Sequence, residues 1–579
     1  MTLLGGRPPL SGSTDSPGDE TLSPISRSVS PPWTRRRVGA FIGTLVIAVF
    51  FAVSWHEIGL GISPLVSGLG NIFRFIGRTL PPQFTGFAGF RSTISLAWET
   101  VCIAFLGTVL AIIISVPLAF LAARNTTPHP VLRWLARGVI TLCRSIPDVI
   151  FAIVFVESLG IGILPGVLAL GFHSVGMLGK LFAETIEQAP PAPGEAVAST
   201  GARRLQHLTA SVVPHVLPSF SSIAVYRLDI NLRSSVILGY VGAGGIGFAL
   251  NAAMGELLFR EASAIVLVMF VLIVLMEIIA AVIRRSLIGD QVVMTGSLRP
   301  RRNLGERIVA RFLPKDQSPK SSLRPPWTHE RVKRYSFLVG VLLMTAISLW
   351  DTKIDPISLV SSLNQIARTV ALYFPPNFSL DGGVLFVGAL QTACVALVAT
   401  IVGVIFAIPI GLLAARNISN RWVYRCARVF LIIVRAVPEL IMAIIFVVAV
   451  GLGLFAGTIA ITVGTVGLMA KLIADSLEEV PKSPREAIAS VGATPAQETT
   501  SAVIAPSVPW LASTSLYLLD VNFRSSTVLG IVGAGGIGYL LYQSIQLLVY
   551  RTTGAIIVVT LVVVLLIEVI TNLIRKQLI

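Results

Sequence analysis

The stretch Asp229–Gly247 reads DINLRSSVILGYVGAGGIG, and it recurs at Asp520–Gly538 as DVNFRSSTVLGIVGAGGIG. Shorter matches pair Pro31–Thr34 with Pro325–Thr328, and Ala122–Asn125 with Ala414–Asn417. The separation between matching segments stays between 291 and 294 residues. A nearly constant separation over most of the chain indicates an internal duplication. The chain therefore consists of two homologous halves.

The composition indicates that lipid is the solvent of both halves. Of the 579 residues, 54% are hydrophobic and only 13% are charged, against about 25% charged residues in a soluble domain. At about 20 apolar residues per helical span, the chain has room for about a dozen spans. The net charge of +16 comes from basic residues between the apolar segments, as the positive-inside rule predicts. We therefore expect contact with membrane lipid and no nucleic-acid partner.

Each half contains about six apolar segments. They lie near 38–55, 94–123, 147–165, 167–183, 218–240 and 264–283, and near 337–350, 384–415, 438–455, 457–473, 509–531 and 555–573. The loop from Arg124 to Arg144 and its counterpart from Arg416 to Arg435 carry Arg and no acid, which predicts a cytoplasmic location for both. An even number of spans per half then inserts both halves in the same orientation, with both termini in the cytoplasm. This excludes the inverted repeats of many secondary transporters, although not parallel repeats.

The predicted fold is an all-α polytopic membrane protein built from two parallel tandem repeats of about six transmembrane helices each. The predicted domains are a disordered cytoplasmic tail (1–32), the first half (33–290), a basic cytoplasmic linker (291–325) and the second half (326–579). The tail is rich in Ser, Pro, Thr and Gly, a composition typical of disorder. Two further segments, Ser63–Phe84 and Asp355–Phe378, are expected to include a helix at the outer surface; their role stays open.

No residue pattern indicates an enzyme or a metal site. The four cysteines have neither disulfide nor zinc spacing, and the six histidines form no H-x-x-x-H pair. The run Gly242–Gly247 matches G-x-G-x-x-G, but no strand–helix–strand unit flanks it, so a nucleotide fold is excluded. We expect no catalytic residue, no metal ligand and no cofactor in this chain.

Between the fourth and fifth predicted spans, each half carries a polar loop of the same design. These loops read PGEAVASTGA at 193–202 and PREAIASVGA at 484–493. In the second copy, Ser483 is expected to cap a helix that Gly492 ends in the left-handed conformation. Thr494–Gln497 then forms a second capping box. The sequence predicts a helix–turn–helix elbow that projects from the membrane.

Both loops resemble the E-A-A-x-x-x-G cytoplasmic loop of the permease subunits of bacterial ABC importers. The resemblance implies that the short helix docks on a separate ATPase and transmits its movement to the spans. The implied docking residues are Glu195, Ala196, Gly201, Glu486, Ala487 and Gly492. The proline that follows the glycine by thirteen residues in that family is Pro214 here, whereas in the second half it is displaced by one residue, to Pro506. The alternative is a capped cytoplasmic helix without a partner.

The fifth predicted span of each half is unusually polar. Its candidate path or gate residues are Asp229, Asn231, Arg233, Ser234 and Ser235, with Asp520, Asn522, Arg524, Ser525 and Ser526. Because an acid and an arginine four residues apart share a helix face, the pair is expected either to neutralise itself and hold the gate or to offer its arginine to an anion. The glycines that follow favour tight packing or gating over anion binding: Gly242, Gly244, Gly245, Gly247, Gly533, Gly535, Gly536 and Gly538.

The pattern D-x-N-x-R-S-S-x-x-L-G-x-V-G-A-G-G-I-G resembles that of PhnE-type permeases of phosphonate importers, whose core has the MetI-like fold. One departure is the Asp at 229 and 520, where relatives are expected to carry Glu. The segments Arg144–Asp148 and Arg435–Glu439 also resemble the start of the third span in that family. In both segments the proline and the acid are typical of a helix N-terminus.

This resemblance implies a fused permease of a binding-protein-dependent importer in the bacterial cytoplasmic membrane, carrying phosphonate or a related oxyanion such as phosphate or phosphite. Its implied partners are an extracytoplasmic binding protein and a cytoplasmic ABC ATPase dimer that holds the ATP and magnesium. Two alternatives stay open. One is an importer permease for another small solute, such as methionine. The other is a secondary transporter or channel without a motor, with Asp229 and Asp520 as ion sites.

Overall fold

A computed structural model of the chain describes residues 35–86, 89–288, 329–354, 356–378, 382–480 and 482–578. These residues form helices joined by loops and contain no strand, which confirms the all-α class. Residues 51–579 form one compact unit that contains most of the first half and all of the second. The predicted tail (1–32) and linker (291–325) lie outside the described residues.

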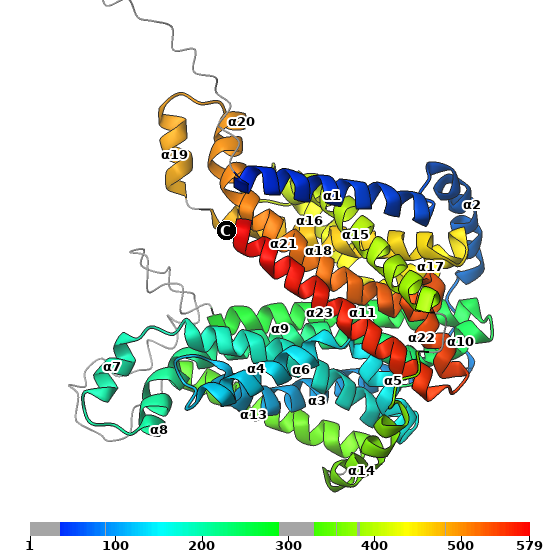
Figure 1. Cartoon of the computed structure of the whole chain (residues 1–579), viewed down its shortest axis with the longest axis horizontal. Helices are drawn as coiled ribbons and strands as arrows, with labels where there is room; N and C mark the ends of the chain where they lie inside the picture. The colour runs from blue at the N-terminus through cyan, green and yellow to red at the C-terminus, as the bar shows by residue number, and fades with distance from the viewer. Residues whose placement is uncertain are drawn as a thin grey trace, which may run out of the picture. The chain divides into compact units, whose positions relative to one another are not determined.

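The two halves have the same order of helices (Figure 1). The first half contains α1 (Arg35–Ile58), α2 (Ile62–Thr79), α3 (Phe90–Ala122), α4 (Pro130–Ser145), α5 (Asp148–Leu159), α6 (Ile163–Glu187), α7 (Ala192–Ala198), α8 (Arg204–His207), α9 (Val213–Tyr240), α10 (Ile246–Gly255) and α11 (Phe259–Ile288). The second half contains α13 (His329–Thr352), α14 (Pro356–Leu372), α15 (Gly382–Leu413), α16 (Arg421–Ala436), α17 (Glu439–Val450), α18 (Leu454–Glu479), α19 (Lys482–Ser490), α20 (Pro495–Glu498), α21 (Ala505–Leu529), α22 (Gly536–Gln546) and α23 (Tyr550–Leu578).

Among the described helices, nine are long and apolar enough to cross a membrane. Two further pairs pass the same test only when joined, and both are sharply bent: α4 with α5 by 87° and α16 with α17 by 84°. The predicted third spans, near 147–165 and 438–455, begin at these bends, and their helices α5 and α17 have only 12 residues each, so neither is a full span by itself. The chain leaves the helical conformation at Ile146 and at Val437, because each precedes a proline that disfavours it. As predicted, the acids Asp148 and Glu439 then begin the next helix.

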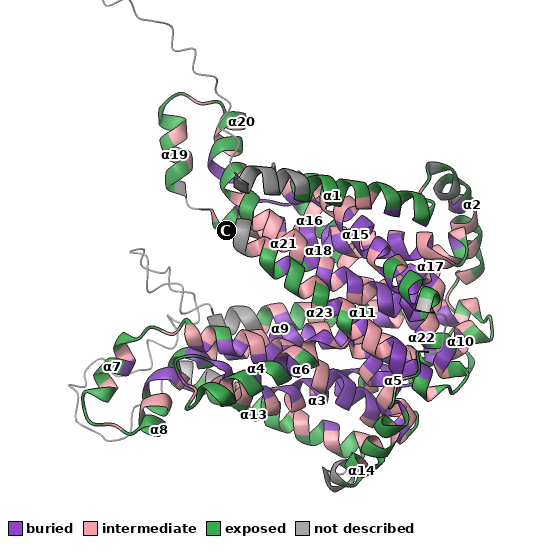
Figure 2. Cartoon of the chain, in the orientation of Figure 1, coloured by how far each residue is buried: buried purple, intermediate pink, exposed green. Residues whose placement is uncertain are grey.

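Within each half, close helix packing depends on small side chains. The helix pairs α3 with α6 and α15 with α18 form the most extensive contacts. Alanines such as Ala111, Ala119 and Ala169 are fully buried there, and small residues let two helix backbones approach closely. Figure 2 shows buried residues concentrated along α5 and α6, whereas α7 and α19 are mostly exposed.

The halves also exchange helices. Helix α2 of the first half packs on α17 of the second, and α14 of the second half packs on α5 of the first. In the first of these contacts, Asn71 Nδ2 donates to the Ala449 carbonyl at 2.8 Å. Helix α13 likewise packs on α3, where Trp98 Nε1 donates to the Asp351 carboxylate at 3.0 Å. The helices expected within 63–84 and 355–378 are thus α2 and α14, and each contacts the opposite half.

The repeated glycine run forms a tight turn between two helices that cross at close range. Gly244 and Gly245 have φ of +76° and +73°, and α10 begins directly after them. Such values favour glycine because a Cβ atom strains the left-handed conformation. A Cβ atom on Gly247 would collide with the Val236 carbonyl oxygen, and one on Gly538 with the Thr527 carbonyl oxygen. At this glycine run, the backbones of the two helices therefore pack directly against each other.

Gly247→Ala and Gly538→Ala are therefore expected to destabilise the protein, because the new methyl group meets backbone atoms that have little room to shift. Overpacking of this kind costs about 1–3 kcal/mol. The melting temperature of the detergent-purified protein should fall by several degrees in each variant. Gly255→Ala is the matched control on α10, because no atom lies within 4 Å of its added Cβ atom. Equal stability of Gly247→Ala and Gly255→Ala would contradict the packing role.

Candidate functional site

Two elbows project from the ends of their own helix bundles (Figure 1). The first elbow comprises α7, α8 and the turn between them (192–207), and the second comprises α19, α20 and their turn (482–498). In each half the elbow connects the fourth predicted span to the fifth. Glu195 and Ala196 are exposed on the first elbow, as are Glu486 and Ala487 on the second. The four side chains are therefore accessible to another protein.

The turns of the elbows follow the sequence pattern closely. Gly492 has φ +82°, as predicted, and Gly201 has φ +78°. The capping box at Thr494–Gln497 is confirmed, because Thr494 N donates to Gln497 Oε1 at 2.9 Å and Gln497 N donates back to Thr494 Oγ1 at 3.4 Å. The prediction for Ser483 is wrong by a small margin: α19 begins at Lys482, so Ser483 lies inside its first turn.

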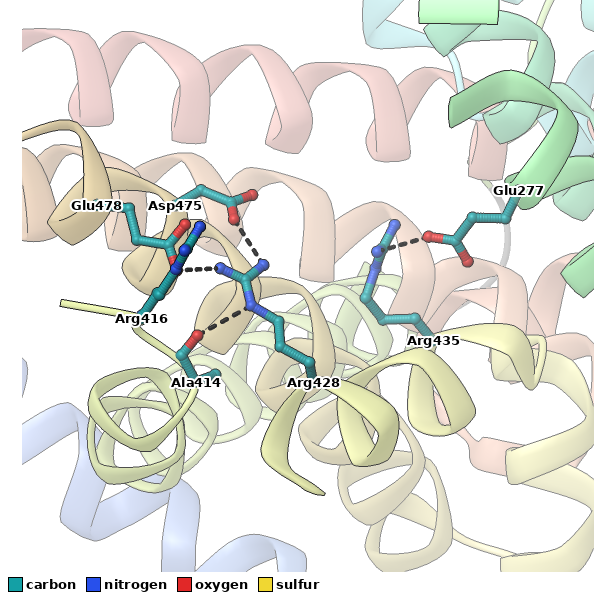
Figure 3. A network of polar contacts seen from close by, with 7 residues as sticks. All are labelled: Glu277, Ala414, Arg416, Arg428, Arg435, Asp475 and Glu478. Atoms are coloured by element: carbon teal, nitrogen blue, oxygen red, sulfur yellow. Dashed lines mark hydrogen bonds and ion pairs between the residues drawn. The ribbon is translucent and has the colours of Figure 1, made fainter. Parts of the chain in front are cut away.

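An arginine clamp, half-buried in the second half and exposed in the first, joins the helix that leads into each elbow to the rest of its half. In the second half, Arg428 contacts Asp475 at 2.8 Å and Glu478 at 3.0 Å, and its Nε donates to the Ala414 carbonyl at 2.9 Å. Figure 3 shows this network, in which the Arg416 amide also donates to Glu478 at 2.8 Å. The clamp connects the ends of α15 and α18 to α16 directly below the second elbow.

The first half has the same clamp. Arg137 contacts Glu187 at 2.7 Å and donates to the Ala122 carbonyl at 2.9 Å, while the Arg124 amide donates to Glu187 at 2.8 Å. Sequence reasoning missed both clamps, although the repeated Ala-Ala-Arg-Asn motif marks the loop that they hold. Because the clamp recurs in both halves, charge-assisted hydrogen bonds hold the end of the helix that leads into each elbow to α4 or α16.

The acid and the arginine of the fifth span form the predicted pair in each half. Arg233 Nη2 contacts Asp229 Oδ2 at 3.0 Å, and Arg524 forms the same contact with Asp520. Both carboxylates are buried. A buried charge is costly unless it has a partner, so each span carries its own neutralising pair. The role of these residues in the path or gate stays a prediction.

The asparagines of the same motif lie deeper and join three helices. Asn231 is 0% exposed; its Nδ2 donates to Thr108 Oγ1 at 2.9 Å, and its Oδ1 accepts from Ser174 Oγ at 3.0 Å. Asn522 contacts Thr400 and Thr465 in the same way. Since both ends of each amide are occupied, these asparagines hold α9 to α3 and α6, and α21 to α15 and α18.

The serines divide between buried and partly exposed positions. Ser235 and Ser526 are buried, and Ser235 Oγ donates to the Leu232 carbonyl at 2.7 Å. Ser234 and Ser525 are partly exposed, and the Ser525 side chain hydrogen-bonds to Glu439 at the start of α17. Ser525 thus connects the fifth span of the second half to the bend of the same half.

Two ion pairs cross between the halves in a reciprocal arrangement. Arg435, at the end of α16, contacts Glu277 of α11 at 2.9 Å (Figure 3). Arg144, at the equivalent position of α4, pairs with Glu568 of α23. Glu277 also lies 3.8 Å from Arg233, so the internal and the crossing pairs meet in one network. Because each partner pair has its counterpart 291 residues along the chain, the two halves are related by a pseudo-twofold axis.

Sequence reasoning missed the glutamates of this network. Glu277 and Glu568 are isolated acids inside the last apolar segment of each half. An ionisable residue in a span needs a partner. The occurrence of a glutamate at the same position of both halves could therefore have indicated an ion pair at each. The sequence comparison of motifs places Arg144 and Arg435 at the start of the third span. Both lie at the last turn before the bend, where they reach the opposite half.

Removing one member of the crossing pair is expected to destabilise the contact between the halves. Arg435→Met leaves Glu277 without its nearest cation, and because the pair is partly buried and Arg233 remains 3.8 Å away, the cost should be below the ~3–5 kcal/mol of a broken buried pair. The double variant Arg435→Met with Glu277→Leu should recover most of the loss, because no unpaired charge remains. Melting temperatures of the wild type, the two single variants and the double variant give the coupling energy. Arg421→Met, at an exposed position of α16, should change little; additive losses in the double variant would contradict the pairing.

Comparison with known proteins identifies the family. The description "Binding-protein-dependent transport system inner membrane component" matches residues 115–289 and 407–579. The Phosphate-import permease protein PhnE of Mycolicibacterium smegmatis is 46% identical over 517 residues, which cover 89% of this chain and 90% of that protein. The Phosphite transport system permease protein PtxC of Stutzerimonas stutzeri is 41% identical over 241 residues, which cover 42% of this chain and 86% of that protein.

A third relative matches a shorter stretch. The Probable D-methionine transport system permease protein MetI of Pasteurella multocida is 31% identical over 189 residues, 30% of this chain and 87% of that protein. The two segments that match the family fall one in each half, and each contains an elbow and a fifth span. The chain therefore belongs to the family of binding-protein-dependent transport system inner membrane components, with one family unit in each of its halves.

Proposed function

We propose that this chain is the complete membrane-spanning core of an ATP-driven importer for phosphate, phosphite or a phosphonate. The observation that carries the proposal is the 46% identity to a phosphate-import permease over both halves at once. The phosphite permease PtxC supports the same class of cargo, because its match spans 86% of that protein. These anions share a tetrahedral phosphorus with charged oxygens.

The motor of this importer is a separate ATPase dimer in the cytoplasm. Family membership supports a partner of this kind, and the two exposed elbows offer two equivalent docking sites. ATP and Mg²⁺ bind to the ATPase, and an extracytoplasmic binding protein delivers the anion. The permease lies in the bacterial cytoplasmic membrane with both termini inside the cell, as the basic loops favour.

The proposed cycle is alternating access. ATP binding brings the two ATPase subunits together, and the elbows follow them. The arginine clamps carry this movement to α4 and α16, whose last turns hold Arg144 and Arg435. Each of these arginines contacts the last helix of the opposite half. A displacement of either elbow therefore reaches the contact between the halves through the clamp, the helix α4 or α16, and the crossing ion pair.

A methionine cargo is the weaker alternative. The MetI relative is 31% identical over 30% of this chain, whereas the phosphate-import relative covers 89% of it. Uptake of labelled phosphate, phosphite, methylphosphonate and methionine by proteoliposomes that contain the permease, its ATPase and its binding protein distinguishes the two cargo classes. Uptake of methionine with none of the phosphorus anions would reject the proposal.

The double variant Glu195→Ala with Glu486→Ala is expected to abolish ATP-dependent uptake, because each elbow loses the exposed carboxylate that the family motif places at the docking contact. The variant should still assemble and melt at the wild-type temperature, since both glutamates are exposed. Labelled phosphate uptake and co-purification of the ATPase are the two measurements. Glu256→Ala, at an exposed acid outside the elbows, is the control. Wild-type uptake by the double variant would contradict the coupling role.

A further inference from the structure

Arg227 breaks the symmetry between the halves. It lies in α9 and is 3% exposed, and the equivalent position of the second half, 291 residues along the chain, is Leu518 at 1% exposed. The fold therefore accepts an apolar side chain at this position. A buried cation inside a span is costly and is typically retained for a function. The first half therefore buries a cation at this position, and the second half does not.

The guanidinium of Arg227 is incompletely satisfied. Its Nε donates to Ser174 Oγ at 2.8 Å, and its Nη1 contacts the Met177 sulfur, a weak acceptor, at 3.1 Å. Its Nη2 atom has no hydrogen-bond partner in the part of the chain that the structure describes. Asp148 acts on Arg227 electrostatically, but no hydrogen bond joins them among the described residues. The outer edge of the guanidinium is thus left without a strong acceptor.

The position of Arg227 is close to the pseudo-twofold axis. Its neighbour Tyr226 lies within electrostatic reach of Tyr517, the equivalent residue of the second half. Residues that meet their own counterparts lie near the symmetry axis that relates the halves. Tyr226 and Tyr517 are nevertheless 40% and 44% exposed. Part of each tyrosine is therefore left uncovered by the part of the chain that the structure describes.

A second arginine faces the same region. Arg524 of α21 lies within electrostatic reach of both Arg227 and Tyr517. Asp520 binds Arg524 through Nη2, and the Arg524 Nε atom has no hydrogen-bond partner among the described residues. Each of these two guanidinium groups has a donor without a partner among the described residues, and the two lie within electrostatic reach of each other. Like charges repel, and an anion between them removes the repulsion while it fills the donors.

We propose that Arg227 and Arg524 together bind the phosphorus oxyanion as it crosses the middle of the membrane, at a single site displaced toward the first half. The inference rests on the proposed function and names the residues that hold the cargo. Phosphate, phosphite and phosphonates share the charged oxygens that a forked guanidinium recognises. The site therefore accepts all three and leaves discrimination among them to the binding protein.

The test compares the wild type with three variants in proteoliposomes that contain the ATPase and the binding protein. Arg227→Leu introduces the residue that the second half carries. Arg227→Lys keeps the positive charge but removes the planar set of N–H donors of the guanidinium. The third variant combines Arg227→Leu with Leu518→Arg, which transfers the guanidinium across the axis. Uptake of labelled inorganic phosphate is measured, together with phosphate binding to the permease–ATPase complex without its binding protein.

Arg227→Leu is expected to reduce uptake and binding by about tenfold or more, the effect of one lost charge-assisted hydrogen bond. Arg227→Lys should retain an intermediate level, and the transfer variant should recover part of the loss. A structural arginine would be rescued less completely by transfer, because Leu468 stands in the second half where Met177 stands in the first. Leu518→Met is the control and should transport like the wild type.

Two results would overturn the inference. One is uptake by Arg227→Leu within twofold of the wild type. The other is a loss that neither Arg227→Lys nor the transfer variant relieves, which would assign Arg227 to packing alone. Neither of these two results contradicts the proposed function, because the wild type still transports phosphate in both cases. A wild type that moves no phosphate, phosphite or methylphosphonate would instead reject the proposed function itself.

Discussion

A charge inside the hydrocarbon region has no water to solvate it, so it must find a partner within the protein. This chain meets that constraint twice in each half. One pair is internal to the fifth span, Arg233 with Asp229, and one reaches across, Arg435 to Glu277. The crossing pair lies at the bend between α16 and α17, where the helix turns by 84°. The electrostatic requirement and the bend therefore coincide, and one of the contacts that join the halves lies where each half changes direction.

Uncharged polar groups follow the same principle at lower cost. The Asn231 amide donates to Thr108 and accepts from Ser174. A buried network whose groups all have partners fixes the relative position of the helices that contribute to it. Arg227 shares Ser174 with this network but has no equivalent in the second half. The duplication thus preserved the residues that hold each bundle together and allowed position 227, next to the conserved Tyr226, to diverge.

The repeat, the helical class and the elbows could be predicted from the sequence, because each rests on local patterns: apolar length, paired motifs, and capping residues such as Thr494 and Gln497. The bent pairs could not, since the arginines of α4 and α16 mark both segments as loops, and hydropathy does not show that each is a helix leading into α5 or α17 through a bend. The crossing pairs depend on contacts between residues more than 150 positions apart, and periodicity carries no information about such partners. Arg227 was missed for a different reason. It stands just before the repeated motif, at a position where the two copies differ.

The exchange of α2 and α14 has a consequence for biogenesis. Helix α2 is synthesised early, but the surface on which it packs, α17, emerges from the ribosome more than 350 residues later. During that interval its partner face has no native contact, and the first half cannot reach its final packing alone. Covalent linkage of the halves keeps the late surface at a high local concentration. Fusion of the two halves into one polypeptide therefore replaces a slow encounter between two separately inserted chains by the association of two parts of the same chain. It also supplies one copy of each half to every assembled core.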